Sequence, residues 1–198
     1  LFYTIQNTPY ENEGFIQEKG EEFIALFHHG NERMLLKIYQ ELLEVLYDHG
    51  EFAEAERRIR QARTTISGNL SPEIWGWYYY ILAGYYDAVL GGAYDAETAE
   101  EAHLVRLLLK SVDRAIRWLT ISNAGDAGIF LGECYRLKAL VLIRSGIGKK
   151  KQVRTILGRV QKLIDKYAQP NSKLVRDYDM TLAWYHTYVE GDYRLTCS

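Results

Sequence analysis

The sequence predicts an all-α protein built from antiparallel helical hairpins, and three observations support this fold class. Only three prolines occur in 198 residues, so nearly the whole chain is free to be helical. Strand-like alternation is hard to find outside the first eight residues. The stretch 32–62 has the pattern of two amphipathic helices joined by a short turn.

Residues 32–62 form the clearest hairpin. In the first arm, large apolar residues recur at three- and four-residue intervals and so share one helical stripe: Met34, Leu35, Ile38, Tyr39, Leu42, Leu46 and Tyr47. Gly50 can adopt the left-handed conformation that ends a helix. A second stripe then runs through Phe52, Ala55, Ile59 and Ala62. The pattern predicts two helices packed antiparallel.

The second arm resembles part of a tetratricopeptide repeat. The matching residues are Gly50, Glu51 and Phe52 in the turn, followed by Ala55, Ile59 and Ala62. In that family, glycine makes the turn, the aromatic ring fills the gap between helices, and small residues let helices approach closely. The first arm departs from the family at Leu43, where a small residue is usual. The resemblance implies hairpins stacked as a right-handed superhelix, with the first helix of each hairpin lining its concave surface.

Helix-start signals place the remaining elements. An extended lead-in at 1–13 precedes a helix expected from Gly14 to Gly30. Ser71, Pro72 and Glu73 are typical of a helix start. Thr98 and Glu101 have capping-box spacing, within an insertion at 95–103 that we expect to be helical itself.

The turn glycines divide the chain into four units. Gly50, Gly91, Gly146 and Gly191 each follow a predicted first helix. The units run approximately over 32–67, 72–120, 127–168 and 172–198, and the last is incomplete. We expect one domain from 14 to 198. The start at Leu1 suggests a piece of a larger protein.

Composition narrows the function classes. A net charge of −2 gives no general reason to expect an anionic membrane as partner, or nucleic acid bound by this segment itself. Cys134 and Cys197 lie far apart without metal spacing, so both are expected to be free thiols in a reducing, cytoplasmic compartment. The five histidines lack a metal or nucleophile context. We therefore predict no catalytic residue, no metal and no cofactor.

Aromatic residues are the main candidates for ligand binding. The block from Trp75 to Tyr80, with Tyr85 and Tyr86, cannot point all its side chains one way on a helix. If the first helices line a groove, its wall would include these five residues: Tyr39, Trp75, Tyr79, Tyr86 and Tyr135. The alternative is that these rings fill wide gaps between hairpins as core residues.

Lys149, Lys150 and Lys151 form a second candidate site. They open a predicted helix, where backbone amides also favour anions, so the sequence predicts an anion-binding spot. Binding of nucleic acid or an acidic partner would be one use of this spot. The alternative is a solvated helix tip.

The resemblance implies a non-catalytic scaffold that binds a protein or peptide. Irregular, lengthened repeats of this kind are similar to sensor regions of bacterial regulators, which suggests a signalling or transcription-regulating protein. A sensor for a small ligand or signalling peptide is the alternative function, and self-association is a further possible role. An enzyme would require a cleft with coupled titratable groups, which the sequence does not indicate.

Overall fold

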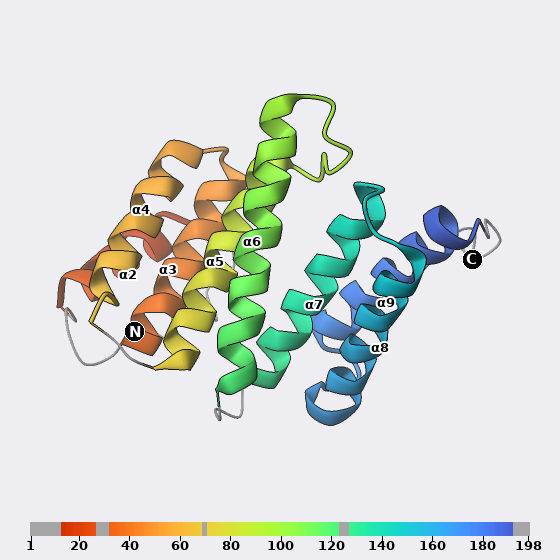
Figure 1. Cartoon of the computed structure of the whole chain (residues 1–198). Coiled ribbons are helices and arrows are strands. Elements are labelled where there is room, and N and C mark those ends of the chain that lie inside the picture. The colour runs from red at the N-terminus through yellow and green to blue at the C-terminus, as the bar shows by residue number, and fades with distance from the viewer. Residues whose placement is uncertain (1–12, 27–31, 69–70, 123–126, 192–198) are drawn as a thin grey trace.

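The computed structural model describes residues 13–26, 32–68, 71–122 and 127–191, and its regular elements there are all helices (Figure 1). The prediction of an all-α fold is confirmed. In chain order the elements are α2 (Glu13–Leu26), α3 (Glu32–Asp48), α4 (Phe52–Thr65), α5 (Pro72–Leu90), α6 (Ala99–Ile121), α7 (Ala127–Arg144), α8 (Lys150–Tyr167), α9 (Lys173–Tyr185) and the π-helix η2 (His186–Glu190). No described helix is both long and apolar enough to cross a membrane.

The helices pack as a series of hairpins. The pairs α3 with α4, α5 with α6, and α7 with α8 are each in contact (Figure 1). The first helices also contact one another in sequence, α3 with α5, α5 with α7, and α7 with α9. Four helices from different parts of the chain therefore share one side of the molecule.

Glycines end the first helix of each unit, as the sequence predicted. The backbone φ angle is +71° at Gly50, +53° at Gly91, +68° at Gly146 and +72° at Gly191. A side chain is strained in this left-handed region, whereas glycine adopts it readily. Each turn can thus follow its helix within a few residues.

The helix starts predicted at 71–73 and at Thr98 are confirmed, since α5 begins at Pro72 and α6 at Ala99, whereas the separate helix expected at 95–103 is not. Thr98 and Glu101 form the predicted capping box, in which each side chain accepts a hydrogen bond from the other residue's backbone N–H. The stretch 95–103 is not a separate helix, because α6 already begins at Ala99 and continues unbroken to Ile121. Ser71 occupies the N-cap position of α5, but its side chain makes no capping hydrogen bond.

Two predictions at the amino end have different outcomes. The helix expected over 14–30 is α2, which the structure describes over Glu13–Leu26, and residues 27–30 lie outside the described residues. The lead-in predicted for 1–13 lies outside the described residues, apart from Glu13 at the start of α2.

The core consists of three clusters of buried side chains in series. The first is formed by α2, α3, α4 and α5, the second mainly by α5, α6 and α7, and the third by α7, α8 and α9. Aromatic side chains join the first two, since Tyr79, Tyr80 and Phe130 pack against both. Because α5 and α7 each contribute to two clusters, they are the helices through which the hairpins are connected.

At Gly76, α5 approaches α6 so closely that a side chain would not fit between them. A Cβ atom added there would lie 2.7 Å from Cγ of Leu119 and 3.1 Å from its backbone nitrogen. Gly84, two turns further along the same helix, has no such neighbour within 4 Å. Packing therefore requires glycine at Gly76 and does not require it at Gly84.

These two glycines give a matched prediction for stability. Glycine in a helix interior costs up to about 1 kcal/mol relative to alanine. We therefore expect Gly84→Ala to raise the free energy of unfolding by up to about 1 kcal/mol. Gly76→Ala should lower it by about 1–3 kcal/mol, because the added methyl group overpacks the contact with Leu119. Urea denaturation measures both, and equal effects of the two substitutions would contradict the packing described.

Candidate ligand-binding cavity

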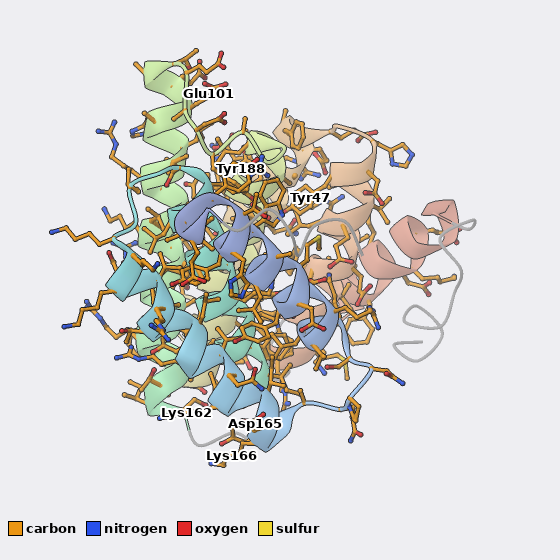
Figure 2. All side chains as sticks on the ribbon, turned by 90° about the vertical axis from the view of Figure 1, so that its right-hand side faces the viewer. Tyr47, Glu101, Lys162, Asp165, Lys166 and Tyr188 are labelled. Atoms are coloured by element: carbon orange, nitrogen blue, oxygen red, sulfur yellow. The ribbon has the colours of Figure 1, made fainter. Side chains whose placement is uncertain are left out.

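A cavity of about 240 Å³ lies among the first helices of the hairpins. Its lining comes from four helices: Gln40, Leu43, Glu44 and Tyr47 of α3; Tyr80, Ile81, Gly84, Asp87 and Ala88 of α5; Glu133, Arg136 and Leu137 of α7; and Lys173 of α9. Tyr47 is labelled in Figure 2, which views the molecule from the side of α9. This volume suits one side chain or a small ligand, being just below the roughly 300–1,000 Å³ typical of small-molecule sites.

Helical periodicity explains why these residues meet. On α3 the lining residues follow at intervals of three, one and three positions, and on α5 at intervals of one, three, three and one. Such spacing places residues on one face of a helix. The cavity is therefore built where the mixed polar and apolar faces of successive first helices converge.

An ion-pair network forms the α7 wall of the cavity. Arg136 Nε donates a hydrogen bond to Glu133 Oε2 at 2.9 Å. The Nη2 atom of the same arginine lies 3.7 Å from Asp177 Oδ2 on α9. Glu133 is buried, with 8% of its surface exposed. A carboxylate at such a position needs a compensating charge, and Arg136 supplies it. The pairing also connects α7 to α9.

Two tyrosines supply hydroxyl groups to the cavity. Burial raises the pKa of Tyr47 well above its ordinary value, with Tyr85 and Glu44 adding to the effect. Burial also raises the pKa of Tyr80, next to the charge of Glu133. Both phenols therefore stay protonated and can donate. The Tyr47 hydroxyl is buried and has no hydrogen-bond partner among the described residues, so a ligand could satisfy it.

Asp87 is a cavity carboxylate whose pKa is shifted by burial. Burial raises its pKa above the ordinary value of 3.8, although the hydrogen bond from the Tyr94 hydroxyl and the charges of Arg136 and Arg144 oppose that shift. With Glu44 and Glu133, three carboxylates line the cavity, against the cations Arg136 and Lys173. The lining thus carries an excess of negative charge.

None of the five aromatic residues predicted for a groove lines this cavity. Tyr39 is 1% exposed and belongs to the first core cluster. Trp75 and Tyr79 do lie together, with ring centroids 6.1 Å apart, and the Arg114 guanidinium is 5.2 Å from the Tyr79 ring. Both rings are partly buried against the core.

The other two predicted aromatic residues lie apart from that pair. Tyr86 packs against the second core cluster, and its ring is 5.4 Å from that of Tyr85. Tyr135 points towards α8, where Arg159 Nη1 donates to its hydroxyl at 3.3 Å. The five rings thus do not form one wall in this structure. Their part in binding stays a prediction.

The structure divides the three lysines predicted to bind anions. Lys149 and Lys151 line a surface hollow with Lys138 and Arg159. Lys150 points elsewhere and lies 3.4 Å from Glu190 of η2. Lys149 occupies the N-cap position of α8.

The described residues contain neither a reactive cysteine nor a cluster of side chains placed to hold a metal ion. Cys134 is a free thiol, as predicted, and burial raises its pKa, which keeps it protonated and unreactive. Cys197 lies outside the described residues. Within the described ranges, no group of three or more His, Cys, Asp or Glu side chains is placed to hold a metal ion.

Comparisons with protein-family models, with curated proteins and with solved structures gave no match. The candidate site therefore rests on its own geometry.

The residues that line the cavity were not predicted from the sequence because they follow no single pattern. Tyr80 adjoins Tyr78 and Tyr79 in the sequence, and nothing in the aromatic block distinguishes it. The available signal was Asp87, the one charged residue in the stretch from Ile74 to Leu90. A charge in an apolar helix needs a local reason, and here that reason is the cavity.

The pKa of Asp87 leads to a prediction for pH dependence. Because its folded pKa is raised, the folded state holds this proton more tightly than the unfolded chain does. The penalty for ionising Asp87 is absent below about pH 3.8 and grows as pH rises through the raised pKa. We expect the stability of Asp87→Asn relative to the wild type to increase as pH rises from about 4 and to level off above the raised pKa, as measured by urea denaturation between pH 4 and pH 7.

The exposed Asp179 of α9 provides the control, as Asp179→Asn. A stability difference for Asp87→Asn that stays constant over this pH range, or one that Asp179→Asn reproduces, would contradict the assignment.

Proposed function

We propose that the chain is a non-catalytic scaffold that binds a protein segment or peptide and anchors one of its side chains in the cavity. The observation that carries this proposal is the origin of the lining, to which α3, α5, α7 and α9 all contribute. The proposal agrees with the tetratricopeptide resemblance of the sequence, in which such helices line a concave surface for peptides. It also retains, on that resemblance alone, a place in a larger bacterial regulatory protein.

The cavity chemistry favours a basic anchor side chain. Leu43, Ile81 and Leu137 provide apolar walls for the methylene stem of a lysine or arginine. Glu44 and Asp87 provide carboxylates for its charged end. The buried Tyr47 hydroxyl adds a polar partner for the peptide itself.

A small-ligand sensor is the second candidate function. The observation that favours it is the size of the cavity, which accommodates a compact amine as readily as a side chain. Both candidates place the ligand among the same residues, so one variant can test them together.

Gly84→Leu is the variant that tests the site. Gly84 lines the cavity, and a Cβ atom added there meets nothing within 4 Å, so the new side chain would fill the cavity without displacing the backbone. The matched control is Gly158→Leu on α8, where an added Cβ atom also meets nothing and which does not line the cavity. Circular dichroism verifies that both variants are folded.

We expect the wild-type chain to select peptides with a shared Lys or Arg from a random display library. Calorimetry should then show at least a tenfold loss of affinity for Gly84→Leu and no change for Gly158→Leu, because only the first substitution occupies the cavity. Unchanged peptide affinity in Gly84→Leu would place binding elsewhere. If no peptide is selected but small amines stabilise only chains with an open cavity in thermal shift, the sensor function is favoured instead.

A further inference from the structure

Positive charge is concentrated in two helices of this weakly acidic chain. Residues 104–121 and 149–167 hold eleven of the 24 Lys and Arg residues but only two of the 26 Asp and Glu residues. These ranges are most of α6, and α8 with its N-cap residue. The rest of the chain is correspondingly acidic, so the net charge of −2 averages over two regions of opposite sign.

On α6, the basic residues share one exposed face. Arg106, Lys110, Arg114 and Arg117 follow at intervals of four, four and three positions, and they line one surface hollow together. All four are exposed.

On α8, a second basic hollow lies beside the first. Lys149, Lys151 and Arg159 line it, together with Lys138 of α7. The Lys138 Nζ atom lies 2.5 Å from Oδ1 of Asp113, which lines the hollow on α6. That ion pair joins the two hollows into one surface, which we call the basic face.

Figure 2 shows nitrogen-tipped side chains of α6 and α8 projecting towards the left of the view. Lys162, Asp165 and Lys166 are labelled at the carboxyl end of α8. The positive charge therefore continues along α8 beyond the hollow.

Most cations of the basic face form no ion pair with a described residue, unlike three arginines of α4. On α4, Arg57, Arg58 and Arg60 each form an ion pair with a glutamate. Among the described residues, by contrast, no carboxylate forms an ion pair with these cations of the basic face: Arg106, Lys110, Arg117, Lys149 and Lys151.

Like charges four residues apart on a helix also destabilise it, as Arg106, Lys110 and Arg114 do here. The fold maintains this charge at a cost to its own stability.

We propose that the basic face binds the sugar-phosphate backbone of nucleic acid, without reading its base sequence. Exposed Lys and Arg side chains are the groups that neutralise phosphates and release their counterions. The Tyr135 ring near the face is already covered by Arg159, whose Cζ lies 5.5 Å from its centroid. The aromatic platform required for stacking of bases is therefore occupied, and phosphate contacts remain.

The composition of the face favours nucleic acid over an acidic protein. Protein interfaces have an apolar core and are depleted in lysine, whereas nucleic-acid interfaces are more polar and much more positive. The large apolar residues that the structure exposes, such as Ile121, Ile147 and Met180, do not line either hollow. A hollowed surface also fits a strand better than a flat membrane.

The test measures, by fluorescence anisotropy, the binding of a fluorescein-labelled single strand of DNA, 20 nucleotides long and of mixed sequence. The same sequence is also tested as single-stranded RNA and as a DNA duplex. The patch variant is Lys110→Glu/Arg117→Glu/Lys151→Glu. The control is Arg60→Glu/Arg63→Glu/Arg176→Glu, which changes the net charge equally at exposed positions off the face. Polyglutamate of matched charge serves as the competing acidic polypeptide, and circular dichroism verifies folding.

Wild type should bind with a slope of log K against log salt of about −5, if the seven exposed cations of the face all engage a single strand. The patch variant should reduce that slope to about −3 and weaken binding at least tenfold at low salt. The control variant should bind like the wild type. No binding at 50 mM salt, equal losses in both variants, or tighter binding of polyglutamate than of the oligonucleotides would each overturn the proposal.

This inference is independent of the proposed peptide site. Gly84→Leu fills the cavity on α5 and should leave oligonucleotide binding unchanged. The patch variant should leave peptide affinity unchanged in turn.

Discussion

The indole ring of Trp77 makes the contacts on which the arrangement of the first helices depends. Trp77 belongs to α5 and is 2% exposed. Its ring lies 4.6 Å from that of Phe130 on α7, and its Nε1–H donates to Gln40 Oε1 of α3 at 3.2 Å. One side chain thus fixes three of the four helices that line the cavity.

The same contact connects the core to the cavity wall. Gln40 lines the cavity, and its Nε2 atom lies 3.5 Å from Oε1 of Glu44, another lining residue. Lys37 lies above the Trp77 ring, 5.3 Å from its centroid. Glu44 is therefore oriented by a hydrogen-bond chain that begins in the apolar core. Such support is what holds a binding site in a fixed geometry.

The helices and turns could be predicted from the sequence because turn glycines and helix caps involve residues only a few positions apart. Gly50 and Gly191 were found from the left-handed backbone that their turns require, and Thr98 with Glu101 from the spacing of a capping box. The separate helix expected at 95–103 failed because α6 starts at its own cap and includes residues 99–103. The expectation came from the usual length of a repeat, which says nothing about where a cap lies.

The cavity could not be predicted because its parts come from four helices. Tyr79 and Tyr80 are adjacent in the sequence, yet Tyr79 packs beside Arg114 of α6 and Tyr80 lines the cavity next to Glu133 of α7. Only the packing of α5 between its neighbours decides which ring faces which way. The net charge of −2 likewise does not show how charge is distributed, since it sums over acidic and basic surfaces that the fold keeps apart.

The most direct test of this account is hydrogen exchange, followed by mass spectrometry, in the folded Trp77→Leu variant. If Trp77 holds the first helices together, amide exchange should accelerate in α3 around Gln40 and in α7 around Phe130, while α8 stays protected as in the wild type. Acceleration confined to α5, or spread evenly over every helix including α8, would contradict the central place given to this residue.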